Sequence, residues 1–315
     1  MAKFFVVGDI TVDQMYFVSE LPEPGGNVSA NRAVMEPGGA GGTIAVALAR
    51  LGHDVKLAAR VGKGPFSELA LKNVHSSKVD TKLVQVDPKL QTSSITLLIT
   101  PDTQRTMISA GGASRNLDAT ELKSADIAAC DALVLSAYSL IGGLQREYAV
   151  RALDAAKKHR LTIFIDMGSG AVTALRDRLL AVLRDADYLL MNQQELFEVT
   201  GETSISDAVS GLAQSGIERV IVKVGSMGSI VVTPELTELV EAYEVDEVID
   251  STGAGDYYTA AFAHGIMEGY DLHYAARLGN IAGALNVTRV GAQSYRVDAN
   301  NLELLATQGL AVETL

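Results

Sequence analysis

The residues best suited to chemistry in this chain lie between Asp250 and Asp256, in the run Asp-Ser-Thr-Gly-Ala-Gly-Asp. An apolar strand is expected to lead into this run, and a helix is expected over Tyr257–Glu268. Gly253 and Gly255 let the backbone turn tightly because they have no Cβ. The first N–H groups of the helix have no partner within it, so they form a cup that attracts an anion.

Asp256 stands beside this cup, and two interpretations of it are open. Aspartate is a common capping residue in the first turn of a helix, which would make Asp256 purely structural. The combination of an anion cup, an adjacent carboxylate and a second carboxylate at Asp250 instead favours transfer of a phosphoryl group to a hydroxyl. Under that interpretation Asp256 is the base.

The run resembles the phosphoryl-transfer signature of the PfkB/ribokinase family of carbohydrate kinases, whose pattern is D-[ST]-T-G-A-G-D. The resemblance implies that Asp256 takes the proton from the acceptor hydroxyl. It also implies that the backbone of Gly253, Ala254 and Gly255 stabilises the transferred phosphoryl group. The likeness extends over nearly the whole chain, from residue 8 to about residue 291.

A second glycine-rich run, Gly38-Gly39-Ala40-Gly41-Gly42, precedes a helix expected over Thr43–Leu51. It is not a dinucleotide-binding fingerprint, because G-x-G-x-x-G needs a glycine where Ile44 stands. A phosphate-binding loop of the form G-x-x-x-x-G-K-[ST] is absent from the sequence. Neither standard nucleotide-binding motif therefore explains the run.

The same run resembles the N-terminal signature of the PfkB/ribokinase family. The resemblance implies that Gly38 and Gly39 approach the sugar, that Thr43 faces it, and that Asp13 holds two of its hydroxyls. A carboxylate can accept hydrogen bonds from both members of a vicinal diol. Asp13 could also be a turn or strand-end carboxylate, and Asp9 is a less favoured candidate for the same role.

Further motifs resemble the nucleotide side of the family's site. Asn192 and Glu195 have the spacing of the N-x-x-E motif, which helps to place Mg²⁺ and the phosphates and suits a metal that prefers oxygen ligands. The pair also fits a helix capping box, and the two roles are compatible. The resemblance assigns ATP binding to Asn192, Lys223, Gly225, Gly228 and Asn280, Mg²⁺ binding through water to Glu195, and an activating monovalent cation such as K⁺ to Asp250 and Thr252.

The departures from the family pattern lie on the acceptor side. Thr43 stands where the family has asparagine, and Tyr138 stands where ribokinases have glutamate. The residues Met167–Gly170 lack an arginine that many sugar kinases carry. Arg105 could pair with an anionic group of the substrate, although a solvent-exposed role is the simpler interpretation. Intact transfer chemistry beside an altered pocket indicates an active kinase whose acceptor is not ordinary ribose.

The expected secondary structure alternates strand and helix, which predicts a mostly parallel sheet covered on both faces. Strands are expected at 4–7, 55–61, 132–135, 162–165, 188–191, 219–224, 229–233 and 238–245, and helices at 67–76, 144–159, 172–184, 194–200 and 206–215. Extended segments near 14–36 and 92–110, the latter joined by a turn at 101–104, do not fit the alternation. The resemblance identifies them as a lid over the sugar site and suggests a homodimer formed through it. The predicted fold is a ribokinase-like three-layer α/β/α sandwich, a single domain over residues 1–315 with a small β-lid.

Composition narrows the class of protein. The net charge of −12 argues against a nucleic-acid-binding or anionic membrane surface, and 48% hydrophobic residues are ample for a core. Cys130 is the only cysteine and is expected to be a small buried residue. The five histidines show no metal-ligand spacing and are expected at the surface or in loops. No signal-peptide core or membrane-spanning run is found, so a cytoplasmic enzyme is expected.

These motifs together predict an ATP- and Mg²⁺-dependent kinase acting on a hydroxymethyl group of a sugar or sugar-like small molecule. Two alternatives stay open. The acceptor could be a nucleoside, with Tyr16 and Phe17 as an aromatic platform, since the same family includes nucleoside kinases. The chain could also be a sugar- or nucleotide-sensing protein that has lost turnover.

Overall fold

The computed structural model describes residues 1–102, 105–175 and 182–308. Within them, nine strands form a central sheet in the order β13-β12-β11-β10-β9-β8-β1-β4-β5. All neighbouring strands are parallel except for the β11–β12 and β12–β13 pairs. The strands are β1 (Lys3–Val7), β4 (Asp54–Val61), β5 (Val84–Val86), β8 (Ala132–Ser136), β9 (Thr162–Asp166), β10 (Tyr188–Asn192), β11 (Val220–Lys223), β12 (Ser229–Val232) and β13 (Thr237–Val240).

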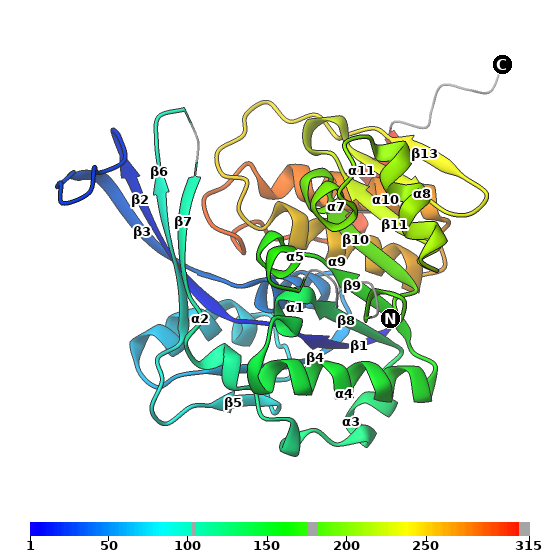
Figure 1. The fold of residues 1–315 in the computed structure, drawn as a ribbon, viewed down its shortest axis with the longest axis horizontal. Helices are drawn as coiled ribbons and strands as arrows, with labels where there is room; N and C mark the ends of the chain where they lie inside the picture. The colour runs from blue at the N-terminus through cyan, green and yellow to red at the C-terminus, as the bar shows by residue number, and fades with distance from the viewer. Residues whose placement is uncertain (103–104, 176–181, 309–315) are drawn as a thin grey trace.

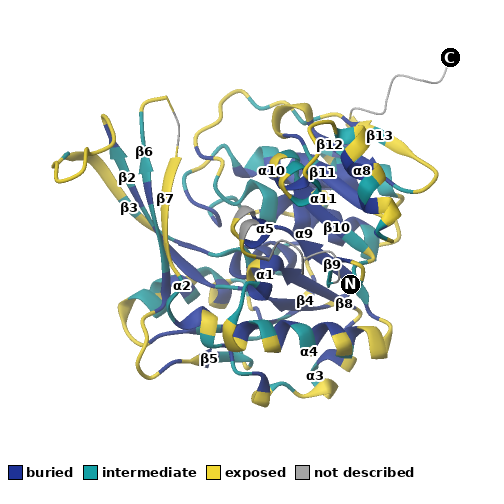
Figure 2. Cartoon of the chain, viewed as in Figure 1, coloured by how far each residue is buried: buried dark blue, intermediate teal, exposed yellow. Residues whose placement is uncertain are grey.

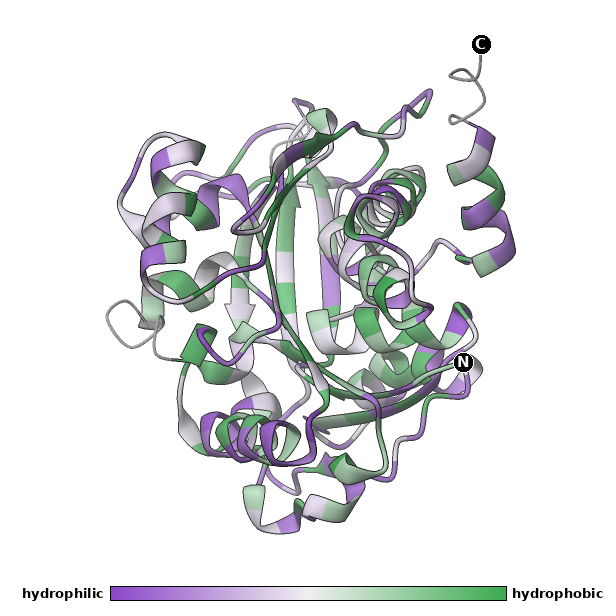
Figure 3. Cartoon of the chain, turned by 90° about the vertical axis from the view of Figure 1, so that its right-hand side faces the viewer, coloured by the Kyte–Doolittle hydropathy of each residue, from purple (hydrophilic) through white to green (hydrophobic). Residues whose placement is uncertain are grey.

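Helices cover both faces of this sheet, and Figures 1 and 3 show the resulting three layers. Side chains of β1 alternate between two apolar clusters: Phe4 and Val6 pack on one face, Phe5 and Val7 on the other. The first face carries α1 (Ala40–Arg50), α2 (Pro65–Ser76), α9 (Ala254–Met267), α10 (Leu272–Asn286) and α11 (Ala299–Gln308). The second carries α3 (Ser124–Ala128), α4 (Gly143–His159), α5 (Ser169–Leu175), α7 (Gln193–Thr200) and α8 (Ile205–Gln214). The predicted fold class is confirmed.

A second sheet stands apart from the main body, at the left of Figure 1. Its order is β3-β2-β6-β7, with β2 (Thr11–Val18), β3 (Ala30–Gly38), β6 (Ser93–Ile99) and β7 (Arg105–Ala110). β2 and β6 are parallel, and each carries an antiparallel partner. All six residues of β7 are exposed, so both faces of this edge strand are accessible to solvent (Figure 2). The two extended segments that did not fit the alternation therefore form one small sheet.

The glycine-rich runs fold differently from the prediction. α1 begins at Ala40 instead of Thr43, and α9 begins at Ala254 instead of Tyr257, so the helices include glycines that their low helix propensity had excluded. The strand expected before Asp250 is absent from that part of the structure, which was a wrong prediction. The N–H groups of Ile249 and Asp250 donate instead to the carbonyl of Val287, just after α10.

Several short elements were not predicted. β5 has three residues and α3 has five, too few for a periodic pattern to be recognisable. Short 3₁₀ turns at η1 (Gly112–Asn116), η2 (Ala119–Glu121), η3 (Ala137–Leu140) and η5 (Gly225–Met227) were also missed. The helix expected over 172–184 and the turn expected at 101–104 lie partly outside the described residues. Among the described helices, none is both long and apolar enough to span a bilayer.

Candidate active site

The carboxyl ends of the parallel strands bring together polar side chains that are far apart in the sequence. Asp9 follows β1, Ser136 and Asp166 end β8 and β9, and Asn192 and Lys223 end β10 and β11. In an open α/β sheet this edge is where ligands bind. Three residues named from the sequence, Asp9, Asn192 and Lys223, therefore lie at the same edge of the sheet as Ser136 and Asp166, which the sequence analysis did not select.

The N-terminus of α9 supplies the anion cup. Gly253 is the N-cap residue in the left-handed conformation (φ 77°), and a Cβ there would lie 2.7 Å from the carbonyl oxygen of Ala292. Only glycine fits this turn. The N-cap position provides no side-chain hydrogen bond, and the Ala254 N–H donates to the Ser251 carbonyl at the long distance of 3.4 Å, so no capping side chain competes with a ligand for the first N–H groups of α9. Asp256 lies in the first turn beside them.

Asp256 is surrounded by charge. Burial, the largest cause, raises the pKa of its carboxyl group well above the ordinary value, and the nearby Asp166 raises it further, whereas Lys223 lowers it. Lys223 Nζ donates to Asp166 Oδ1 at 2.7 Å, and Thr259 Oγ1 donates to the same oxygen at 2.7 Å. A Cβ placed on Gly255 would lie 3.3 Å from Lys223 Nζ, so the ammonium group lies against the cup. A buried carboxyl group and a lysine therefore lie together beside the glycine turn that begins α9.

On the acceptor side, Asp13 lies directly against Gly38. A Cβ on Gly38 would be 2.2 Å from Asp13 Oδ2, and Thr11 Oγ1 donates to Asp13 Oδ1 at 2.8 Å. Asp13 is 3% exposed, and burial raises the pKa of its carboxyl group to about 7. Gly39 has a φ of 86°, which presents its backbone without a side chain. Gly38 therefore packs against the Asp13 carboxylate, and Gly39 packs against the backbone at Asp9–Thr11 beside it.

Asp9 and Thr43 behave differently from Asp13. The carboxylate of Asp9 accepts backbone N–H groups of Gly41 and Ala40 at the start of α1, and one of its oxygens, Oδ1, is buried without a partner. Thr43 is fully buried, and Gln293 Nε2 donates to its Oγ1 at 3.4 Å. Gln293 was missed by the sequence analysis because 250 residues separate it from Thr43 and no motif marks it.

Tyr138 enters the same region from the segment after β8. A Cβ on Gly168 would lie 2.3 Å from its ring and a Cβ on Gly170 3.0 Å from it, so the ring covers a surface made of glycine. Burial raises the pKa of its hydroxyl to about 12, and the charges of Asp9 and nearby site carboxylates contribute. Its side chain is 37% exposed, so it is an accessible aromatic wall of the site.

The motifs on the nucleotide side have clear structural roles. Asn192 and Glu195 form a complete capping box on α7: Asn192 Oδ1 accepts from the Glu195 N–H at 2.8 Å, and Glu195 Oε2 accepts from the Asn192 N–H at 2.9 Å. Gly225 and Gly228 have φ values of 63° and 103° in the turn between β11 and β12. Asn280 Nδ2 donates to two carbonyls at 240–241, which ties α10 to the end of β13.

The loop before α9 is held from several directions. Asp250 Oδ1 accepts from the N–H and Oγ1 of Thr252, and its Oδ2 accepts from the Gly291 N–H at 2.8 Å. Asn286 Nδ2 donates to the Thr252 carbonyl, while Asn286 Oδ1 is buried without a partner. From β7, Arg105 Nη1 donates to Thr252 Oγ1 at 3.1 Å. The small sheet thus contacts the loop that carries the anion cup.

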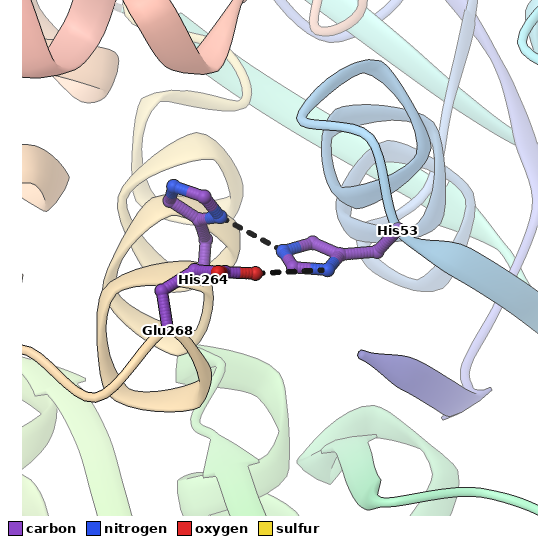
Figure 4. A group of neighbouring side chains, drawn as sticks. All are labelled: His53, His264 and Glu268. Carbon is purple, nitrogen blue, oxygen red and sulfur yellow. Dashed lines mark hydrogen bonds and ion pairs between the residues drawn. The ribbon is translucent and has the colours of Figure 1, made fainter. Parts of the chain in front are cut away.

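A separate cluster of potential metal ligands, His53, His264 and Glu268, lies at the other end of α1 and α9 (Figure 4). His53 and His264 are buried, so their expected surface position was wrong. The Ala2 N–H donates to His53 Nδ1, which leaves the proton of a neutral ring on Nε2, 2.8 Å from His264 Nδ1. A protonated Nε2 cannot bind a metal, so the pair acts as a hydrogen-bond link between the helices. Cys130 is buried, as predicted.

Comparison with known proteins agrees with this geometry. A family model described as "pfkB family carbohydrate kinase" matches residues 1–299. A deoxyribokinase of Salmonella typhi is 26% identical over 296 residues, covering 92% of this chain and 94% of the relative, and a ribokinase of Arabidopsis thaliana is 30% identical over 304 residues, covering 91% and 76%. A putative ribokinase II from E. coli, solved in complex with ATP and Mg²⁺, superposes with a TM-score of 0.84 at 24% identity, covering 98% of this chain and all of that one.

Proposed function

Because this chain belongs to the pfkB family of carbohydrate kinases, we propose that it transfers the γ-phosphoryl group of ATP to a hydroxymethyl group of a sugar or sugar-like small molecule. The observation that carries this proposal is the position of Asp256 in the first turn of α9, beside an uncapped anion cup. The names of the matched relatives, deoxyribokinase and ribokinase, support a small sugar as the acceptor class.

In the proposed reaction, the acceptor hydroxyl gives its proton to the carboxylate of Asp256 as its oxygen bonds to the γ-phosphorus. The bond from that phosphorus to the bridging oxygen of ATP breaks, and ADP leaves. The N–H groups of Gly253–Gly255 and the dipole of α9 stabilise the charge on the transferred group. The raised pKa of Asp256 suits a base that must take a proton near neutral pH.

The acceptor is held in this proposal by Asp13 and the backbone of Gly38 and Gly39. A carboxyl group with a pKa of about 7 can accept hydrogen bonds from two hydroxyls once it is ionised. Thr43 would line the acceptor side of the pocket, with its Oγ1 oriented by the hydrogen bond from Gln293 Nε2. Tyr138 places a neutral ring where ribokinases have a glutamate, which supports an acceptor other than ordinary ribose.

The nucleotide would lie along Lys223, Gly225 and Gly228, with Asn192 and Asn280 shaping its site. Asp166, Glu195 and Asp256 place more negative than positive charge around Lys223, which a divalent cation would offset. The carboxylate of Glu195 supplies an oxygen donor of the kind that Mg²⁺ prefers. Bound Mg²⁺ would neutralise phosphate charge there, with Glu195 holding it through water.

A monovalent cation such as K⁺ would fit beside the loop before α9. Asp250 and Thr252 supply oxygens there, and the buried, unpartnered Asn286 Oδ1 lies on the same loop. An oxygen donor left without a partner inside the protein is the kind of group that a hard cation satisfies.

The small sheet would act as a lid, since Arg105 already reaches Thr252 across the site. One face of the small sheet exposes Met35 and Ile108, which are 48% and 62% exposed and lie in the same cross-strand row. Burial of these side chains against a second copy would form the homodimer.

The test is coupled ADP release with ATP and Mg²⁺ against pentoses, ketohexoses, acidic sugars and nucleosides. Asp256→Asn should reduce kcat on the preferred acceptor by about 10²–10⁴-fold, the usual contribution of a positioned base. Near-normal turnover in this variant would refute the assignment of the base. Nucleoside turnover without sugar turnover would select the nucleoside-kinase alternative, and ligand binding without turnover on any acceptor would select the sensor.

A further inference from the structure

Lys223 and Asp166 form an ion pair inside the site, of which the sequence motifs named only the lysine. The side chains are 14% and 4% exposed, and Nζ lies 2.7 Å from Asp166 Oδ1. A pair this well buried is costly to form, because both charges must leave water. Its position at the edge of the sheet where the active-site residues meet points to a function beyond stability.

Two contacts fix the pair relative to Asp256. Asp166 Oδ1 also accepts from Thr259 Oγ1 at 2.7 Å, and Thr259 lies three residues after Asp256 on α9, on the same side of the helix. On the other side, Lys223 Nζ lies against Gly255. The ammonium group is thereby held next to the cup that would receive the transferred phosphoryl group.

We propose that Asp166 is a positioning residue that holds the Lys223 ammonium against the glycine cup, and that the two opposite charges of this pair act together on the transferred group and on Asp256 beside it. The inference rests on the proposed function, in which Asp256 is the base. The Lys223 ammonium would stabilise negative charge on the phosphoryl oxygens directly. Asp166 would hold that ammonium in place, and its own negative charge would act on Asp256. Threonine at position 223 could provide neither effect.

The charges around Asp256 predict the direction in which its pKa changes when either partner of the ion pair is replaced. After burial, Asp166 is the largest cause of the raised pKa of Asp256, Lys223 opposes it, and Asp9 and Asp13 add smaller increases. Tyr138 also lies within the field of Asp256 but stays neutral at physiological pH. Removing Lys223 should therefore raise the pKa of Asp256, and removing the charge of Asp166 should lower it.

The experiment is the pH profile of kcat/KM for the acceptor at saturating ATP and Mg²⁺, in the wild type, Lys223→Met, Asp166→Asn and the double variant. The acid limb reports ionisation of the base. The acid limb should move to higher pH in Lys223→Met and to lower pH in Asp166→Asn, by about one to two pH units, the usual effect of one nearby charge on a carboxyl group. The double variant loses no net charge, so its limb should return close to that of the wild type.

Lys223→Met should also raise KM for ATP, which a purely structural ion pair would not do selectively. The surface pair Lys157–Asp185, at 2.6 Å, provides the matched control: Lys157→Met and Asp185→Asn should leave the limb in place. If Lys223→Met does not fold, Lys223→Thr replaces it, because the shorter side chain leaves room for water beside Asp166.

Acid limbs that stay fixed, or that move in the same direction in both single variants, would overturn the proposal while leaving Asp256 as the base. Full activity of Asp256→Asn would instead overturn the proposed function itself, so the two failures are distinguishable.

Discussion

Gly38→Ala tests the acceptor side of the site through a single methyl group. Gly38 ends β3 and lies against the carboxylate of Asp13, and a Cβ there would be 2.2 Å from Oδ2 and 2.5 Å from both Oδ1 and Cγ. Its φ is not in the left-handed region, so alanine would cause no backbone strain. The whole effect of the substitution must therefore come from displacement of Asp13.

The size of the effect follows from that contact. To reach ordinary van der Waals separation, the carboxylate must move by about 1 Å, and a misplacement of that size costs about 10²-fold in rate. The move also breaks the hydrogen bond from Thr11 Oγ1, which lowers the free energy of unfolding by about 1–3 kcal/mol. ATP binding should be unaffected, because the cup at α9 is untouched.

The assay is kcat/KM for the acceptor and KM for ATP, measured with the thermal midpoint of each variant. Gly211→Ala is the control, since a Cβ there meets nothing within 4 Å and alanine favours the interior of α8. We expect a loss of about 10²-fold in acceptor kcat/KM for Gly38→Ala and none for Gly211→Ala. An unchanged acceptor kcat/KM in a folded Gly38→Ala protein would refute the placement of Asp13 at the acceptor.

Three other predictions follow from contacts described above. Thr43→Asn should break the link to Gln293 and change the ranking of acceptors in the ADP-release panel more than KM for ATP; equal loss on every acceptor would contradict this. Burial lowers the pKa of His53 to about 4 and lowers that of His264, so the folded state binds fewer protons than the unfolded chain below pH 6.5 and loses stability as the pH falls toward 4. At pH 5 this effect of His53 should lower the free energy of unfolding, measured in urea, by about 2 kcal/mol. The His53→Gln variant should not show this pH-dependent loss. Ile108→Lys should shift the mass measured by light scattering from dimer to monomer, and an unchanged mass would exclude the small sheet as the interface.

Features encoded in short stretches of sequence were predictable. The alternation of strands and helices fixed the central sheet, and the glycine runs marked both helix N-termini that meet at the site. Both helices were nevertheless predicted to begin three residues too late. The low helix propensity of glycine argued against including the glycine runs, which the first turns of α1 and α9 contain. Val248 and Ile249 resembled a strand because they are apolar, yet both are exposed and the segment bonds to Val287.

Long-range partners could not be predicted in the same way. Lys223 and Asp166 are 57 residues apart, and His53 and His264 are 211 apart. Each pair is formed by packing of strands or helices that carry no shared local pattern. The sequence could name Lys223 as a phosphate ligand, but only the fold reveals the carboxylate that holds it.

The uncapped start of α9 has a consequence for the stability of the protein without ligand. A capping side chain stabilises a helix by about 1 kcal/mol, but Gly253 has none, and the contact of its Cβ position with Ala292 forbids serine or aspartate there. A phosphate-bearing ligand would supply the missing acceptors itself and would therefore complete the fold as it binds. Binding at 100 times Kd would add about 2.7 kcal/mol of stability, so resistance to heat should depend on nucleotide concentration. The hydrogen bonds that hold the phosphate would then also stabilise the folded state of this protein.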